Sequence, residues 1–290
     1  SETCAMMEWL RLTIELLRMT GAAAYAGQIE RIAYNALPGA QFPDGFGWTY
    51  HSVMNGTRTR TGEFACCSSS GAMAWEEIPR TLYATAGRGV CVNVYAPSAA
   101  TLDPGGCAVR IEQETAYPFD GKVKLTVHPE RATRFSLALR VPEWLEGSAF
   151  TLDGGKVNAA PGTYHTVSRV WRKGDTVTIE FPMPVRIAVQ TRAYNEKGWY
   201  LDGETEYRAV HKGPLLYATR RRDTPERQNP LAVSAGFSPS DAKAVPARRG
   251  GAGTALRVAL RNGARTFVPY YAVCGRENGT HHVVWMKVEE

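Results

Sequence analysis

Two short groups of residues in this sequence carry side chains that bind transition metals. Glu2 and Cys4 lie at the N-terminus, and the adjacent Cys66 and Cys67 follow after a long intervening segment. Zinc binds thiolate sulfur and carboxylate oxygen and is usually four-coordinate in structural sites, so these residues could complete one site. Their spacing is not that of a zinc finger, and free cysteines are often buried like small apolar side chains. The spacing alone is compatible with a metal site and also with a set of buried thiols.

The other cysteines do not suggest a disulfide-stabilised protein. Six cysteines in 290 residues are too few for a disulfide scaffold. Adjacent cysteines such as Cys66 and Cys67 seldom bridge each other, because disulfide geometry is awkward across one peptide bond. Cys91, Cys107 and Cys274 fall in or beside strand-like runs and are expected to fill cores. Metal-binding thiols must stay reduced, which favours a cytoplasmic location in a bacterium.

Composition and charge exclude several classes of protein. The chain is 44% hydrophobic and 21% charged, which is ordinary for a globular protein. No apolar run approaches the roughly 20 residues that span a bilayer, so we expect no membrane segment. The net charge is +6, but the basic residues are spread along the chain, and the densest cluster, Arg220-Arg221-Arg222, lies in a polar connector. We therefore expect no nucleic-acid partner.

The first third of the sequence has helical periodicity. Apolar residues at helical spacing predict a helix over 4–20, which Gly21 ends, and a second helix that closes at Pro38-Gly39. Residues 40–64 predict a long insertion with a short strand or hairpin. A further helix is expected over about 72–84, shortened or kinked by Pro79.

After residue 87 the apolar period changes from helical to two, which is typical of half-buried antiparallel strands. The clearest strands are expected at 90–94, 123–127, 135–141, 177–181, 210–217, 256–260, 267–273 and 283–288, with a loop over 220–253. His281-His282, beside the last of these, are interpreted as surface residues. The pattern predicts a multidomain α plus β protein with a helical part at 1–86, an antiparallel β-sandwich at 87–195 and a second β-rich domain at 196–290.

Several motifs occur in the order and approximate spacing of a known enzyme family. They are Ser1-Glu2-Thr3-Cys4-Ala5, Tyr25-Ala26 with Glu30-Arg31 and Tyr34-Asn35, and Cys66-Cys67 followed by Ser69-Ser70-Gly71. Together they resemble the zinc-dependent β-L-arabinofuranosidases of glycoside hydrolase family 127 and its relatives. The resemblance covers most of the chain, with its specific motifs in the first third.

The resemblance implies a fold, an activity and a set of site residues. It implies that residues 1–86 are the last helices of an (α/α)6 barrel, followed by β-sandwich domains. It also implies retaining cleavage of β-linked L-arabinofuranose from a carbohydrate substrate. Glu2, Cys4, Cys66 and Cys67 match the zinc ligands, Cys66 matches the nucleophile, and Tyr50 matches a tyrosine that contacts the sugar.

The sequence also departs from the family pattern. Phe64 stands where well-known members have a further cysteine, and Ser68-Ser69-Ser70-Gly71 replaces a segment with prolines. The family's acid/base glutamate lies upstream of the Glu-Thr-Cys motif, so we expect this chain to be the C-terminal part of a longer protein. The apolar helix faces that include Leu10, Leu17 and Ile29 should then be unusually exposed or be covered by a partner chain.

Two alternatives to the enzyme are left open by the sequence. The chain could be a non-catalytic carbohydrate-binding or packing fragment, since a β-sandwich does not determine function. It could also hold a purely structural zinc ion with all four ligands closed around it. A homo-oligomer is compatible with either.

Overall fold

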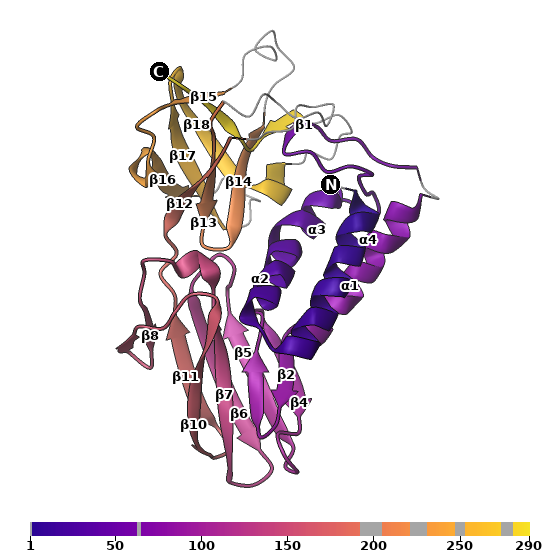
Figure 1. Ribbon diagram of the computed structural model, residues 1–290, viewed down its shortest axis with the longest axis vertical. Helices are drawn as coiled ribbons and strands as arrows, with labels where there is room; N and C mark the ends of the chain where they lie inside the picture. Colours follow the sequence, from indigo (N-terminus) through magenta and orange to yellow (C-terminus); the bar gives the residue numbers. More distant parts are fainter. Residues whose placement is uncertain (1, 63–64, 192–204, 221–230, 247–252, 274–280) are drawn as a thin grey trace. The chain divides into compact units, whose positions relative to one another are not determined.

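The computed structural model describes the chain except for residues 1, 63–64, 192–204, 221–230, 247–252 and 274–280 (Figure 1). The chain forms two compact units. The first contains residues 1–8, 32–74 and 185–290, and the second contains residues 9–31 and 75–184. The domain boundaries expected from the sequence stay a prediction. None of the helices in the described ranges combines the length and the apolar character needed to cross a membrane.

The expected N-terminal helices are present. Helix α1 (Thr3–Thr20) ends at Gly21, whose backbone φ of 64° is readily adopted by a residue without a Cβ atom. Helix α2 (Ala23–Arg31) continues through a π-helical segment (Ile32–Ala36) into α3 (Leu37–Ala40). Pro38 therefore does not end the helical run as predicted. It lies in the first turn of α3, directly after the π-helical segment, and the helical run ends two residues later at Ala40.

Helix α4 (Cys66–Glu77) begins six residues earlier than the predicted start at 72. Serine is acceptable in a first helical turn, where the backbone N–H groups need no intrahelical partner, so the run after Cys67 does not delay the helix. The helix gives way to a 3-10 turn (Ile78–Thr81) that contains Pro79. The prediction that this proline shortens the helix is confirmed.

The helical faces expected to be exposed are buried. Leu10, Leu17 and Ile29 retain at most 8% of their surface, so that expectation was wrong. Within the second unit, Glu30, which follows Ile29 on α2, is hydrogen-bonded to Tyr117, Arg140 and Trp144. The exposed apolar side chains of α1 are instead on a different face, at positions 9, 12 and 19.

The second unit contains two sheets. One has the strand order β10-β7-β3-β2 and the other the order β4-β5-β6-β11-β8-β9. The pairing is antiparallel except between β3 and β7, which run parallel, so the expectation of purely antiparallel sheets was incomplete. The strands are β2 (Tyr83–Ala86), β3 (Gly89–Val92), β4 (Ser98–Leu102), β5 (Val109–Thr115), β6 (Lys122–Pro129), β7 (Thr133–Val141), β8 (Phe150–Leu152), β9 (Gly155–Val157), β10 (Thr163–Trp171) and β11 (Asp175–Glu180).

The first unit is built on a ten-stranded sheet. Residues 210–217, predicted as one strand, form a hairpin, because Gly213 adopts a φ of 54° between β13 and β14. The predicted loop over 220–253 contains two strands, of which β15 runs parallel to β20. The strands are β12 (Val185–Gln190), β13 (Tyr207–Lys212), β14 (Leu215–Arg220), β15 (Ala232–Ser234), β16 (Ala242–Pro246), β17 (Thr254–Leu260), β18 (Gly263–Pro269), β19 (His281–Val283) and β20 (Met286–Glu289).

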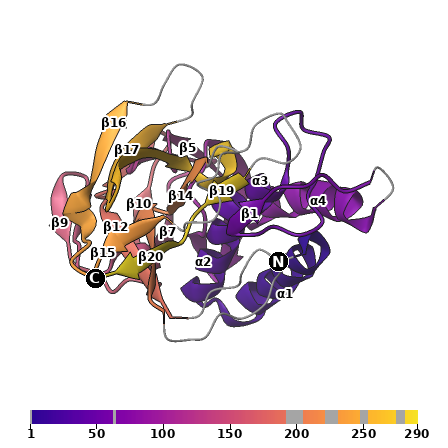
Figure 2. The ribbon, with the colours of Figure 1, turned by 90° about the horizontal axis from the view of Figure 1, so that it is seen from above.

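This sheet also anchors the segment that follows α3. Strand β1 (Asn55–Thr57) pairs with β19, and the two lie side by side (Figure 2). The Asn55 side chain accepts from the backbone N–H groups of Val284 and Trp285 at 2.9 and 2.8 Å. His282 is buried, with Nε2 2.7 Å from the carbonyl oxygen of Val53, so its interpretation as a surface residue was wrong. These contacts fix the chain on either side of residue 54.

Candidate metal centre

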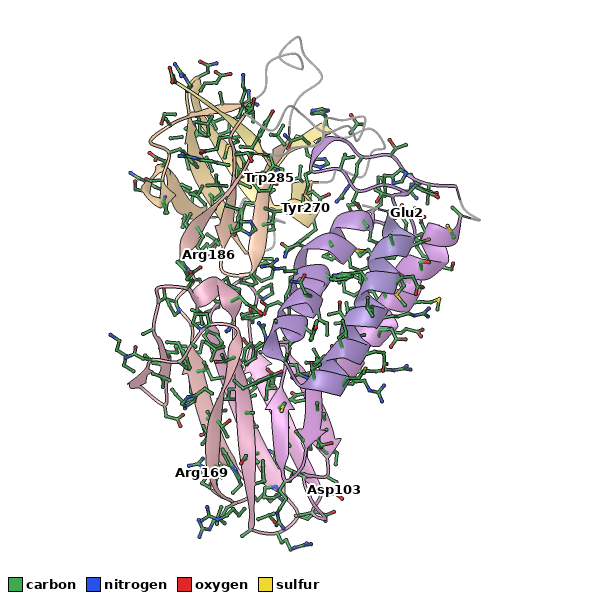
Figure 3. All side chains as sticks on the ribbon, in the orientation of Figure 1. Glu2, Asp103, Arg169, Arg186, Tyr270 and Trp285 are labelled. Carbon is green, nitrogen blue, oxygen red and sulfur yellow. The ribbon has the colours of Figure 1, made fainter. Side chains whose placement is uncertain are left out.

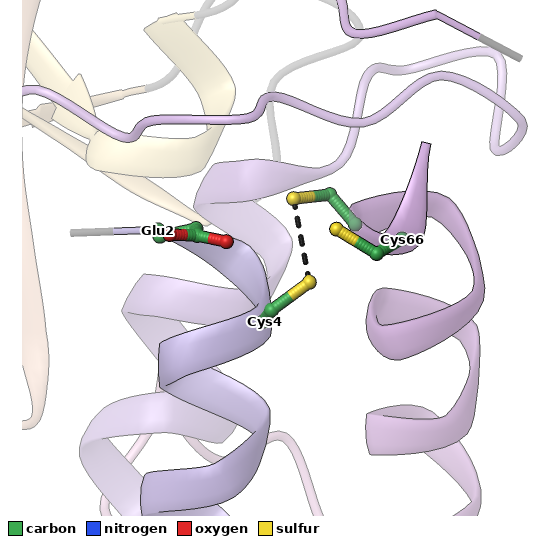
Figure 4. Close-up of side chains that lie close together, drawn as sticks. Glu2, Cys4 and Cys66 are labelled. Carbon is green, nitrogen blue, oxygen red and sulfur yellow. Dashed lines mark hydrogen bonds between the residues drawn. The ribbon is translucent and has the colours of Figure 1, made fainter. Parts of the chain in front are cut away.

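Four side chains predicted as metal ligands come together in the first unit. One ligand atom from each of Glu2, Cys4, Cys66 and Cys67 lies within 4.8 Å of every other. Glu2 lies at the N-terminal end of α1 (Figure 3), and the side chains of Glu2, Cys4 and Cys66 point toward a common centre (Figure 4). Cys67 is buried, Glu2 and Cys4 are half-buried, and Cys66 is exposed. The structure therefore unites residues that are more than 60 positions apart in the sequence.

Two helix N-termini supply the thiols. Cys4 is in the first turn of α1, and Cys66 is the first residue of α4. The N-terminus of a helix carries a partial positive charge from its aligned peptide dipoles, which favours a thiolate over a thiol. The local secondary structure thus suits negatively charged sulfur ligands.

The segment around Tyr50 holds these helix ends together. The carbonyl oxygen of Tyr50 accepts from the backbone N–H of Thr3 at 3.0 Å and lies 4.0 Å from Sγ of Cys67. The Thr3 hydroxyl, which is buried, donates to the carbonyl oxygen of Thr49 at 2.7 Å. The main chain at residues 49–50 therefore contacts both the N-terminal end of α1 and the cysteine pair of α4. Side-chain patterns in the sequence do not reveal this role.

The Tyr50 side chain faces the carboxylate of the cluster. The charge of Glu2, followed by the hydrogen bond between the two side chains, raises the pKa of the Tyr50 phenol. The phenol consequently stays protonated and donates to Glu2. Tyr50 also retains 41% of its surface, so it is accessible to a ligand.

The three thiols differ in their tendency to lose a proton. Burial alone would raise the pKa of Cys4, but hydrogen bonds from Ser70, Cys66 and Cys67 lower it below its ordinary value. The hydrogen bond to Cys4 is the largest factor that raises the pKa of Cys66. Burial raises the pKa of Cys67 to about 12. One negative charge is therefore favoured on Cys4, and the other two thiols donate to it.

The donor set and its geometry fit a zinc ion. Three sulfurs and one carboxylate are ligands that zinc accepts in a tetrahedral site. Two sulfurs that are each about 2.3 Å from a tetrahedral zinc lie roughly 3.8 Å apart. The sulfurs of Cys4 and Cys67 are 3.6 Å apart. The cluster could thus hold such an ion with little rearrangement of these two ligands.

Close packing behind α4 keeps its N-terminal end in place. A Cβ atom on Gly71 would lie 2.3 Å from the ring of Trp48, which is 3% exposed. We expect Gly71→Ala to lower the free energy of unfolding by about 1 to 3 kcal/mol, because overpacking outweighs the better helix propensity of alanine. Urea denaturation would measure this.

Gly62 provides the control for that substitution, because a Cβ atom there would contact nothing within 4 Å. Gly62→Ala should leave stability unchanged or raise it slightly, by about 0.4 to 1 kcal/mol. Equal free energies of unfolding for the two variants would show that a Cβ atom at position 71 does not clash with the ring of Trp48.

Ser70 also contacts the cluster, and it was not among the predicted site residues. Its hydroxyl donates to Sγ of Cys4 at 3.3 Å. The only signal in the sequence was its spacing, three residues after Cys67 and four after Cys66, which places it on the same helical face. Phe64, where the resembling family has a further cysteine, lies outside the described residues.

Comparison with known protein families gives a consistent result over most of the chain. Residues 1–80 match the family model described as beta-L-arabinofuranosidase, GH127 catalytic domain. Residues 89–183 match the model described as beta-L-arabinofuranosidase, GH127 middle domain. A search of curated protein sequences finds no significant match.

Solved structures with the same fold cover the whole chain. A glycoside hydrolase is 25% identical with a TM-score of 0.79, and the match covers 100% of this chain and 52% of that structure. A GH127 beta-L-arabinofuranosidase from Geobacillus stearothermophilus T6 is 27% identical with a TM-score of 0.76, with 100% and 50% covered. A GH127 beta-arabinofuranosidase is 25% identical with a TM-score of 0.79, with 99% and 49% covered. The chain spans about half the length of these structures.

Both the sequence models and the structures show similarity between this chain and glycoside hydrolases. Models for two successive domains of one family match adjacent parts of the sequence. The chain therefore contains regions similar to the GH127 catalytic and middle domains, and it shares the fold of GH127 structures.

Proposed function

We propose that the protein carrying this chain cleaves β-L-arabinofuranosides with retention of configuration, using Cys66 as the nucleophile. The observation that carries the proposal is the convergence of three thiols and a carboxylate in the part of the chain that matches the GH127 catalytic domain. Cys66 is the exposed thiol of the three, so a sugar can reach its sulfur. The substrate would be an arabinofuranoside-type glycan.

In this proposal, Glu2, Cys4, Cys66 and Cys67 bind zinc. When bound, zinc would deprotonate the coordinating thiols and neutralise part of the negative charge that they bring together. Cys4 and Cys67, which are less exposed than Cys66, hold the site. Tyr50, whose phenol donates to Glu2, orients the carboxylate and lies at the accessible side of the cluster, where we propose that it contacts the sugar.

The proposed reaction has two displacement steps. Sγ of Cys66 attacks the anomeric carbon while the glycosidic C–O bond breaks, and the departing oxygen takes a proton from a carboxylic acid, which we place upstream of Glu2. Water then attacks the same carbon and gives a proton to that carboxylate, and the C–S bond breaks. Two inversions at one carbon give net retention, as in glycosidases that use a carboxylate nucleophile.

The similarity to GH127 structures also supports a proposal for the fold around this site. We propose that the helices within residues 1–86 are the last helices of an (α/α)6 barrel, and that the sheets beyond them form β-sandwich domains. The similarity of the whole chain to GH127 structures supports this proposal.

The test is hydrolysis of 4-nitrophenyl β-L-arabinofuranoside by the full-length protein, with bound metal measured by mass spectrometry. We expect about one zinc per chain, and at least about 100-fold loss of activity when a chelator removes it, because the nucleophile is a zinc ligand. Added zinc should restore the rate. Unchanged hydrolysis by metal-free protein would contradict the proposal, and bound zinc without any hydrolysis would favour a structural site.

A further inference from the structure

Ser70 shares one face of α4 with the two cysteines of the cluster. It follows Cys67 by three residues and Cys66 by four, and residues at these offsets are neighbours on a helix surface. Its side chain is half-buried, whereas that of Ser69 is exposed. Ser70 is therefore turned toward the thiols.

The hydroxyl of Ser70 connects α4 to the thiol of the other helix. It donates to Sγ of Cys4 at 3.3 Å, across a sequence separation of 66 residues. The neighbouring Ser69 instead donates to the carbonyl oxygen of Cys66 at 2.9 Å, within its own helix. The two adjacent serines thus make different contacts, and only the contact of Ser70 reaches a sulfur atom that belongs to the cluster.

A hydrogen bond to a ligand sulfur has defined consequences. It fixes the direction of the sulfur lone pairs, and it withdraws part of the negative charge, which makes that sulfur a poorer nucleophile. Groups that orient metal ligands in this way typically change metal affinity or activity by about 10- to 100-fold when they are removed. The contact would therefore make the sulfur of Cys4, which is hydrogen-bonded to Ser70, a poorer nucleophile than the sulfur of the exposed Cys66.

We propose that Ser70 is a positioning residue that keeps Cys4 as a permanent metal ligand and leaves Cys66 as the thiol that reacts. The proposal rests on the metal centre proposed above. It assigns a role to one residue of the serine run that follows the two adjacent cysteines.

The experiment compares Ser70→Ala, Ser70→Thr and Ser69→Ala with the unmodified full-length protein. Zinc affinity is measured by competition with a chromophoric chelator, and Co²⁺ is bound in a second series, in which the sulfur-to-cobalt charge-transfer bands report the ligands. We expect Ser70→Ala to weaken zinc binding about tenfold and to shift these bands, since the hydrogen bond to Cys4 is lost. Ser69→Ala should change neither, and Ser70→Thr, which retains a hydroxyl, should restore most of the affinity.

The possible outcomes distinguish a failure of this inference from a failure of the proposed function. Far-UV circular dichroism should be the same for all variants, because alanine is favourable within a helix. If Ser70→Ala matches the unmodified protein in both affinity and spectrum, the inference is overturned while the metal centre stands. If Ser69→Ala has an equal effect, a general loss of helix stability explains both results and the specific role of Ser70 is overturned. If the unmodified protein binds neither Zn²⁺ nor Co²⁺ at this site, the metal centre itself is wrong.

Discussion

Replacing Glu30 by glutamine is expected to lower the free energy of unfolding by about 3 to 5 kcal/mol, although residue 30 takes no part in the proposed chemistry. Glu30 is 2% exposed and Arg140, its partner, is 0% exposed. The substitution would leave a guanidinium group buried without its main countercharge. Breaking a buried ion pair is far more damaging than never having formed it, because the remaining ion has lost its hydration.

The network around Glu30 explains why water cannot compensate for the loss. Its carboxylate accepts from Arg140, from the Tyr117 hydroxyl and from Nε1 of Trp144, the last at 3.2 Å. Burial by itself would lower the pKa of Arg140, but the charge of Glu30 raises it above its ordinary value. Replacing the carboxylate by an amide removes that charge, but the guanidinium stays protonated because the ordinary pKa of arginine lies far above neutral.

The measurement is urea denaturation of Glu30→Gln beside a matched variant of an exposed ion pair. Glu15 lies 3.4 Å from Arg18 on α1, and these side chains are 60% and 73% exposed. Glu15→Gln should cost less than about 1 kcal/mol, because water replaces the lost interaction. Glu30→Met combined with Arg140→Met should recover part of the loss, since the fully buried ion pair is gone and the other partner of Arg140, Glu143, is 33% exposed. Similar unfolding midpoints for Glu30→Gln and Glu15→Gln would contradict this account.

The strands that could be predicted are those in which one face is buried and the other is not. In β6 and β7, buried and less buried residues alternate, and the sequence shows that alternation directly. Strand β10 was missed because its apolar residues do not alternate and only Trp171 at its end is buried. The hairpin of β13 and β14 was read as one strand because apolar residues continue on both sides of Gly213.

The site was predictable as far as it depends on residue type. The cysteines raised the possibility of a metal site, and the motifs that resemble a known family selected Glu2, Cys4, Cys66 and Cys67 as its ligands. The contributions of Ser70 and of the Tyr50 carbonyl were not predictable, because serine is common on helices and every residue has a carbonyl group. The role of Glu30 was equally hidden, since its partners follow 87 to 114 residues later.

Replacing Cys66 by serine in the full-length protein is expected to reduce hydrolysis of aryl β-L-arabinofuranosides by at least about 10³-fold, because loss of a covalent nucleophile removes the reaction path. A serine hydroxyl is far less acidic than a thiol and is a much weaker nucleophile at neutral pH. The fold should persist, since Cys66 is exposed. Cys91→Ser is the matched control, because Cys91 lies in β3 and outside the ligand cluster, and its activity should be unchanged.

Metal content separates the loss of a nucleophile from the loss of a structural site. With Glu2, Cys4 and Cys67 still present, Cys66→Ser should retain measurable zinc, since three protein ligands are enough to bind the ion. Cys67→Ser should retain less zinc than Cys66→Ser, because Cys67 is the buried ligand and its sulfur lies 3.6 Å from that of Cys4. A Cys66→Ser protein that keeps its zinc and hydrolyses the substrate at the original rate would eliminate Cys66 as the nucleophile. If the variant loses zinc and stability while the unmodified protein shows no hydrolysis to lose, the four ligands form a structural site, and the catalytic thiol must be abandoned.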